Sequence, residues 1–123
     1  VWSQVTDLAW EIVGTGDFDK DGDPDILWRN TGTGPLQGLN IVWYMNGAQF
    51  GSEAVYSWVA DLAWEIAGTG DFDNDGDPDI LWRNYGPGPL QVVNVIWYMN
   101  GAAFVSEEVF SIVADTSWRI LNR

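Results

Sequence analysis

Carboxylates stand at every second position of a nine-residue stretch that this chain of 123 residues contains twice. The aspartates of the first stretch, residues 17–25, are Asp17, Asp19, Asp21, Asp23 and Asp25, and those of the second, residues 71–79, are Asp71, Asp73, Asp75, Asp77 and Asp79. Unneutralised carboxylates this close together repel one another and resist burial unless a cation lies among them. Hard oxygen ligands in this number suit calcium, which takes about six to eight of them. Each stretch therefore predicts one calcium site, which makes two ions per chain.

Two other interpretations of these stretches compete with structural calcium. An EF-hand begins with the same pattern, but it needs a bidentate glutamate at its last position, where this chain has Trp28 or Trp82. The stretches could also be acidic surface turns without a metal, although five neighbouring carboxylates make such a turn costly. A catalytic ion is disfavoured because catalytic metals keep an open position beside a general base. We therefore expect the ions to stabilise the turns that hold them.

The charge and composition of the chain exclude several classes of partner. The net charge is −13 and the pI is near 4.1, which disfavours nucleic acid and anionic membrane surfaces. There is no cysteine for disulfides or thiolate chemistry. No apolar run reaches the roughly 18 residues that a membrane span needs, and the first residues are typical of a strand and not of a signal peptide. We expect a processed, excised or engineered piece of a protein that is extracellular or on the cell surface, where calcium is plentiful.

Nothing in the sequence combines into a catalytic site. Every close pair of carboxylates already belongs to a predicted calcium site, and the remaining glutamates are scattered: Glu11, Glu53, Glu65, Glu107 and Glu108. The chain has no histidine for general base chemistry, no serine in a nucleophile elbow and no glycine-rich loop before a helix. We therefore expect that the chain is not an enzyme.

A repeat of 54 residues covers nearly the whole chain. Residues 7–60 align with residues 61–114 without a gap and match at 41 of 54 positions. Parts of further units flank them, with residues 1–6 as an outer strand and residues 115–123 as the inner strand of a third unit. The chain is thus predicted to hold two complete units and two partial ones.

Each complete unit is predicted to fold as four strands. In the first unit these are residues 10–14, 25–30, 39–45 and 48–58, and no stretch has helical apolar spacing. The pair Asn46-Gly47 predicts a type I′ turn before the last strand, and Asn100-Gly101 predicts the same in the second unit. The third strand is apolar on both faces, so its sheet must be covered on both sides. Four-stranded units of this kind are typical of β-propeller blades.

Two blades cannot close a propeller, which typically has about four to eight. The predicted fold is therefore all-β, with two four-stranded propeller blades and partial blade strands at both ends, closed into a full propeller by homo-oligomerisation. The expected partner is a further copy of the chain. The number of blades in the ring stays open, as does the place of the duplicated ends, residues 1–15 and 109–123.

The segment of residues 14–28, GTGDFDKDGDPDILW, resembles the FG-GAP repeat of integrin α-subunit propellers and of bacterial VCBS-type repeat proteins. The sequence Trp-Tyr-Met-Asn-Gly at residues 43–47 and 97–101 is similar to the bacterial branch. The resemblance spans both units and implies a β-propeller with one calcium per blade, held between the first two strands. It implies side-chain ligands from Asp17, Asp19, Asp21 and Asp25, and from Asp71, Asp73, Asp75 and Asp79. Asp23 and Asp77 would coordinate through their main-chain carbonyls.

Two further positions in each loop carry expectations. Gly22 and Gly76 are expected at the sharp bend, where a side chain is poorly tolerated. Phe18 and Phe72 are expected to point inward and to hold the loop in place.

The aromatic residues suggest both packing and ligand binding. Seven of the nine tryptophans recur in register, as packing between blades requires: Trp10, Trp28, Trp43, Trp64, Trp82, Trp97 and Trp118. Some lectins are built on this calcium-bearing repeat and bind sugars between adjacent blades, so the resemblance implies a pocket at each blade junction. Its predicted lining is Arg29, Asn30, Tyr44, Arg83, Asn84, Tyr85 and Tyr98, although the two arginines could equally pair with nearby carboxylates.

The function predicted from these observations is a non-catalytic, calcium-stabilised β-propeller binding module or scaffold that assembles from two-blade chains. Carbohydrate is the leading ligand class. The alternative is a structural or adhesive repeat fragment, or an engineered self-assembling propeller, that has no small-molecule ligand.

Overall fold

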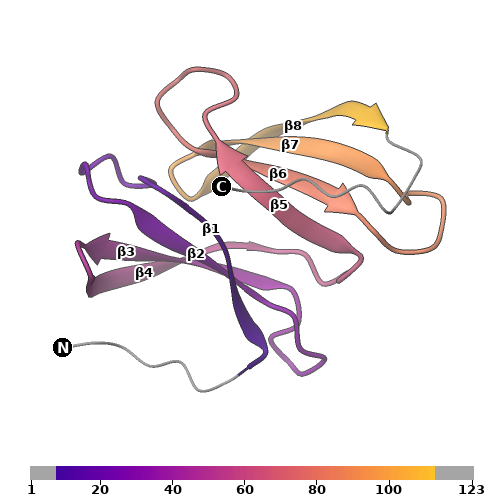
Figure 1. Cartoon of the computed structure of the whole chain (residues 1–123), viewed down its shortest axis with the longest axis horizontal. Coiled ribbons are helices and arrows are strands. Elements are labelled where there is room, and N and C mark those ends of the chain that lie inside the picture. Colours follow the sequence, from indigo (N-terminus) through magenta and orange to yellow (C-terminus); the bar gives the residue numbers. More distant parts are fainter. Residues whose placement is uncertain (1–7, 113–123) are drawn as a thin grey trace.

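The structure is a computed structural model that describes residues 8–112 of the chain. The described residues form β-strands in two four-stranded sheets, one after the other along the chain (Figure 1). The predicted all-β class with two four-stranded sheets is thus confirmed, whereas the predicted terminal pieces, residues 1–6 and 115–123, lie outside the described residues. Within the described range there is no helix of the length and apolarity that a membrane span requires.

The strands follow one another in space in the order of the sequence. The first sheet contains β1 (Trp10–Gly16), β2 (Asp25–Asn30), β3 (Leu39–Asn46) and β4 (Gln49–Trp58), and the second contains β5 (Trp64–Gly70), β6 (Asp79–Asn84), β7 (Val93–Asn100) and β8 (Ala103–Ile112). Each strand pairs antiparallel with the next. The two sheets meet along β1 and β5, which lie side by side in Figure 1.

Successive side chains of a strand point to opposite faces of its sheet, so each sheet has two faces. One face of each sheet is called the front face here. In the first sheet it carries the cross-strand partners Ile12, Trp28 and Ile41, and in the second sheet it carries their equivalents Ile66, Trp82 and Val95. The back face carries the partners Leu27 and Val42 in the first sheet, and Leu81 and Ile96 in the second.

The back face of the first sheet packs on the front face of the second. Leu27 and Val42 have no exposed surface, and they belong to one hydrophobic cluster with Ile80 and Trp82. Burial of side chains of this size contributes about 1.5–3 kcal/mol each. The described residues leave the front face of the first sheet uncovered, and Ile12 on this face is exposed.

The recurring tryptophans are not equally buried. Trp82 is 2% exposed because it lies on the covered front face of the second sheet, whereas its equivalent Trp28 is only half-buried. Each of the two packs at a tilt against the next tryptophan of its own sheet, Trp43 or Trp97, with ring centroids 5.1 Å apart. The recurrence therefore reflects packing within each sheet as well as packing between sheets. Trp118 lies outside the described residues.

The hairpin turns are shifted by one residue from their predicted place. Asn46 pairs with Gln49, so the two-residue turn is Gly47-Ala48 and the predicted type I′ turn at Asn46-Gly47 is wrong. Only Gly47 in this turn has a positive φ, of 61°, which is the pattern of a type II′ turn. Gly101 has the same conformation in the second hairpin, with φ of 60°. Glycine thus occupies the one central position that favours a residue without a Cβ.

Candidate metal centres

The two aspartate-rich stretches form the loops between β1 and β2 and between β5 and β6. We call them the first loop, residues 17–25, and the second loop, residues 71–79. Their backbones turn sharply through left-handed residues, which are Lys20 and Gly22 at φ of 60° and 92°, and Asn74 and Gly76 at φ of 61° and 91°. A Cβ added at Gly22 would meet no atom within 4 Å, so the conformation and not the space favours glycine there.

Carboxylate oxygens gather in each loop closely enough for one ion to bind them. In the second loop Asp71, Asp73, Asp75 and Asp79 each place an oxygen within 4.8 Å of the others, and in the first loop Asp17, Asp19 and Asp21 do so. Calcium binds oxygen at about 2.3–2.6 Å, so two ligands on opposite sides of one ion lie about 5 Å apart. The donors are oxygen only, which suits calcium and not the metals that prefer nitrogen or sulfur. The residues present therefore fit a calcium ion.

Asp25 and Asp79, the last aspartates of the loops, tie the loops to the sheets. Both are fully buried. One oxygen of Asp25 accepts a hydrogen bond from the N–H of Phe18 and the other accepts one from the N–H of Met45, each at 2.9 Å. Asp79 makes the same two bonds to the equivalent residues of the second sheet. Asp79 also belongs to the carboxylate cluster of its loop, whereas Asp25 lies outside the cluster of three in the first loop.

The first aspartate of each loop holds the loop tip. The two oxygens of Asp17 accept hydrogen bonds from the N–H groups of Asp21 at 3.1 Å and Gly22 at 2.8 Å. Loss of solvent by itself raises the pKa of Asp17. The hydrogen bonds from these N–H groups have the opposite effect, and the pKa of Asp17 is lowered overall. The N–H of Gly76 is the main cause that lowers the pKa of Asp71 in the second loop. A carboxylate with a lowered pKa stays charged, as a metal ligand must be.

The phenylalanines of the two loops differ in burial. Phe18 is buried and points inward as predicted, with its ring edge-to-face against Tyr56. The same prediction is wrong for Phe72, which is exposed. Phe18 of the first loop packs in a cluster with residues of the second sheet, and the described residues place no further sheet against the second loop.

Lys20 connects the two loops. Its ammonium lies 3.3 Å from the carboxylate of Asp77 in the second loop. The carboxylate of Asp77 is thereby directed at Lys20, while the prediction assigns the main-chain carbonyl of Asp77 to the ion. Asn74 replaces Lys20 in the second loop, and this is the one position at which the two loops differ. The sequence did not lead us to expect that Lys20 joins the two loops. The difference between Lys20 and Asn74 was the signal that could have pointed to it.

The second aspartates of the loops, Asp19 and Asp73, have raised pKa values. Loss of solvent, followed by the charge of Asp25, raises the pKa of Asp19 to about 6. Loss of solvent, followed by a hydrogen bond with Asp75, raises the pKa of Asp73 to about 6. Both values are above the ordinary aspartate value of 3.8, so these carboxylates are destabilised when no cation is bound.

We expect the calcium-free protein to lose stability as the pH rises from about 4 to above about 6. In this range the folded chain binds more protons than the unfolded chain, because the pKa of Asp19 and Asp73 is about 6 in the fold and 3.8 otherwise. Loss of these protons therefore favours unfolding, and bound calcium should remove the effect by replacing them. Thermal melts at several pH values with and without calcium test this. A calcium-free melting temperature that rises through the whole range would contradict it.

Arg29, which was predicted to anchor a ligand, is buried between the two sheets with 2% of its surface exposed. Its Nη2 donates hydrogen bonds to the main-chain carbonyls of Val59, Asp61 and Trp64 at 3.0, 3.3 and 3.0 Å, on the segment that leads into the second sheet. Its guanidinium lies over the ring of Trp82, with Cζ 5.1 Å from the ring centroid. Arg29 therefore joins the first sheet to the second.

The other residues predicted to bind a ligand are spread over both sheets. Asn30 and Asn84 are buried, and each accepts a hydrogen bond from the N–H two residues later, while Tyr44 is half-buried. Arg83 is buried with its guanidinium over the ring of Tyr85, and the hydroxyl of Tyr98 donates to Glu108 at 2.7 Å. The ligand-binding role of these residues stays a prediction.

A cavity of about 460 Å³ lies between β1 and β5, and Arg29 forms part of its wall. The carboxylates of Glu11 and Glu65 and the hydroxyl of Thr31 line it, and Thr31 donates a hydrogen bond to Glu11 at 2.9 Å. Ile66 adds an apolar side chain to the lining. The junction of the sheets therefore offers hydrogen-bonding groups beside apolar surface.

The sequence of residues 17–82 matches the family described as FG-GAP-like repeat. No curated protein and no solved structure matches the chain. The family match covers more than half of the chain and includes both loops, and the two four-stranded sheets are consistent with two propeller blades. The chain therefore belongs to the FG-GAP-like repeat family.

Proposed function

We propose that the chain is a calcium-stabilised, non-catalytic β-propeller module, with one ion in each blade and two per chain. The first blade is β1–β4 and the second is β5–β8. The observation that carries this proposal is the cluster of carboxylate oxygens in each loop, in a repeat whose relatives are generally binding or structural modules. Extracellular calcium modules work at Kd values of about 10⁻⁴–10⁻³ M, so a location outside the cell or on its surface suits such sites.

Calcium would supply the positive charge that offsets repulsion among the loop carboxylates. The residues of the chain do the positioning. Asp17 holds the tip of the first loop, and Asp25 ties the start of this loop to the end of β3. Because Phe18 of the same loop lies in the core between the blades, a fixed loop also fixes the contact of one blade with the next.

Further copies of the chain would close the propeller. This part of the proposal is supported by the front face of the first blade, where Ile12 and other apolar side chains are exposed. Uncovered apolar faces of this kind mark interaction sites. The closed ring would repeat the same blade junction several times.

Carbohydrate is the ligand class that we propose for the assembled module. The cavity between β1 and β5 offers carboxylates and a hydroxyl that can bond to sugar hydroxyls, beside apolar side chains that can contact sugar C–H groups. Repeated junctions in one ring would bind a glycan surface at several points, which raises the overall affinity without new contacts.

A glycan array probed in calcium buffer and in chelator tests this function. We expect selective binding that chelator abolishes, and we expect Glu11→Ala, in the cavity, to weaken it at least tenfold. Glu53→Ala on β4, which removes the same charge outside the cavity, is the control and should bind like the wild type. A blank array from a protein that still melts at a higher temperature in calcium would contradict the carbohydrate proposal and favour a structural or adhesive repeat.

A further inference from the structure

The repeat allows each residue of the first blade to be compared with its equivalent 54 positions later. Ile66, on the front face of the second blade, is 9% exposed because the back face of the first blade covers it, whereas its equivalent Ile12 is 58% exposed. Two neighbouring pairs show the same difference, since Ile80 and Trp82 are buried while their equivalents Ile26 and Trp28 are half-buried. Within residues 8–112 the chain therefore already covers one such front face with a copy of its own repeat, and these residues leave the other uncovered.

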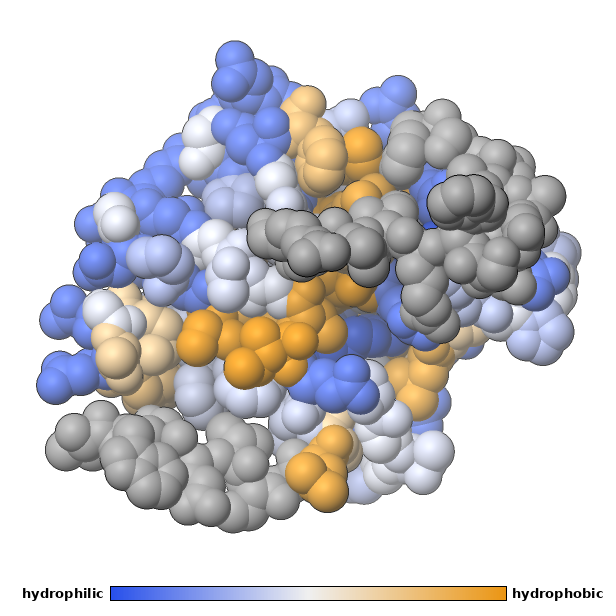
Figure 2. Space-filling view, viewed as in Figure 1, coloured by the Kyte–Doolittle hydropathy of each residue, from blue (hydrophilic) through white to orange (hydrophobic). Residues whose placement is uncertain are grey.

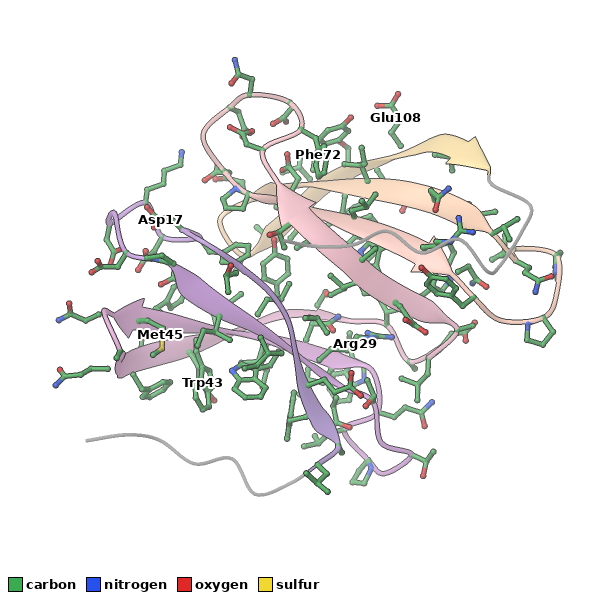
Figure 3. The ribbon with its side chains drawn as sticks, in the orientation of Figure 1. Asp17, Arg29, Trp43, Met45, Phe72 and Glu108 are labelled. Carbon is green, nitrogen blue, oxygen red and sulfur yellow. The ribbon has the colours of Figure 1, made fainter. Side chains whose placement is uncertain are left out.

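The loop of the second blade shows the complementary difference. Phe18 is 1% exposed and belongs to the core between the blades together with Met99. Its equivalent Phe72 is 45% exposed, and Met45, the equivalent of Met99, is only half-buried. Figure 3 shows Met45 on the first sheet and Phe72 in the loop of the second sheet, apart from each other, so they do not meet within one chain. Among the described residues, Phe72 and Met45 each lack the neighbour that their equivalents Phe18 and Met99 have.

The exposure of the outer strands shows how large the surface is that contact between blades covers. Phe50 and Val55 on β4 are exposed, and their equivalents Phe104 and Val109 on β8 are exposed as well, although the second blade is covered by the first. Contact between the blades therefore leaves these four side chains of the outer strands exposed, whereas Tyr56, also on β4, belongs to the core between the blades. The surface that differs between the blades consists of the inner part of the sheet and the loop beside it. Figure 2 shows hydrophobic residues near the middle of the molecule, with hydrophilic residues over the upper left.

We propose that the uncovered front face of the first blade binds the Phe72 edge of the second blade in another copy of the chain. In this contact Phe72 takes the place of Phe18, Met45 takes that of Met99, and Ile12 takes that of Ile66. The inference rests on the proposed function, because it names the two surfaces through which chains close the propeller. The two surfaces differ, so the contact is heterologous and can repeat around a ring.

One contact inside the chain has no counterpart between copies. Lys20 pairs with Asp77 across the blades at 3.3 Å, but the equivalent residues that would meet between copies are Asn74 and Asp23. Asn74 has φ of 61°, close to the 60° of Lys20, so a lysine fits this backbone. We expect Asn74→Lys to tighten the association about 2- to 5-fold, as a partly exposed ion pair does, and high salt to remove the gain.

Sedimentation velocity of the full chain in calcium buffer tests the contact. We expect the wild type to associate, and Ile12→Glu and Phe72→Ser each to weaken association at least tenfold. Val55→Glu introduces the same charge on the exposed outer strand and is expected to leave association unchanged. An equimolar mixture of Ile12→Glu and Phe72→Ser should form a dimer and nothing larger, because each variant keeps one intact surface.

Two results would overturn the head-to-tail contact: a monomeric wild type, and association of Phe72→Ser at wild-type strength. Phe72 is 45% exposed in the single chain, so Phe72→Ser keeps the test decisive if Ile12→Glu fails to fold by circular dichroism. Melting curves of the same samples, with and without calcium, separate this inference from the proposed function. A monomer that calcium still stabilises overturns the contact alone, whereas a chain without any calcium response overturns the proposed function.

Discussion

Alanine at both Asp21 and Asp75 is expected to abolish the stabilisation of the chain by calcium. Each substitution removes one oxygen donor from the cluster of its loop, and a hard cation binds weakly where too few oxygens remain. A site with calcium at 100 times its Kd contributes about 2.7 kcal/mol to the free energy of unfolding, so two sites contribute about 5 kcal/mol. We expect the wild type to lose this amount in chelator, and the double variant to melt at one temperature with and without calcium.

Glu53 and Glu107 provide the matched control for this experiment. Glu53→Gln with Glu107→Gln removes two negative charges from β4 and β8 and leaves both loops intact. The calcium response of this control should equal that of the wild type, while Asp21→Ala or Asp75→Ala alone should lose about half of it. Thermal melts followed by circular dichroism measure all of these values. A full calcium response in the double aspartate variant would contradict the assignment of the loops.

Replacement of Arg29 by alanine is expected to lower the free energy of unfolding by about 3 kcal/mol or more. The substitution removes the group that donates hydrogen bonds to three main-chain carbonyls between the blades. Each buried group left without a partner costs about 1–3 kcal/mol. It also removes the cation–π contact with Trp82. Arg29→Lys keeps the charge but lacks the planar fork of donors, so it should recover only part of the loss. Urea unfolding in calcium buffer measures the three proteins.

Lys20→Gln is the control for Arg29, because Lys20 also joins the two blades. Its ion pair with Asp77 involves a lysine side chain that is 54% exposed, and such pairs contribute about 0–1 kcal/mol. The Arg29→Ala variant should therefore be clearly less stable than Lys20→Gln. Equal stability of the two variants would show that the buried guanidinium does not hold the blades together.

The strands and loops could be predicted from the sequence because their signals are local. The predicted strand of residues 25–30 coincides with β2, and the aspartates and Gly22 lie in the predicted turn. The hairpin was predicted one residue early, because Asn46 stays in the strand and only Gly47 takes the left-handed conformation. Both residues are common in turns, so the sequence pattern alone could not choose between the two positions.

The contacts between blades could not be predicted in the same way. Arg29 bonds to main-chain carbonyls about thirty residues away, and such acceptors leave no mark in the side-chain pattern. The burial of Phe18 and the exposure of Phe72 also depend on whether a neighbouring blade is present and not on the loop sequence, which differs only at Lys20 and Asn74. The repeat therefore predicts equal structures for the two units, while their surroundings make the burial of equivalent residues unequal.

Calcium titration of chelator-treated protein by isothermal titration calorimetry tests the central claim most directly. Two ions should bind per chain, one in each loop, with one ion remaining in Asp75→Ala and none in the double variant with Asp21→Ala. A wild type that binds no calcium, or a double variant that still binds two ions, would contradict the calcium-stabilised propeller.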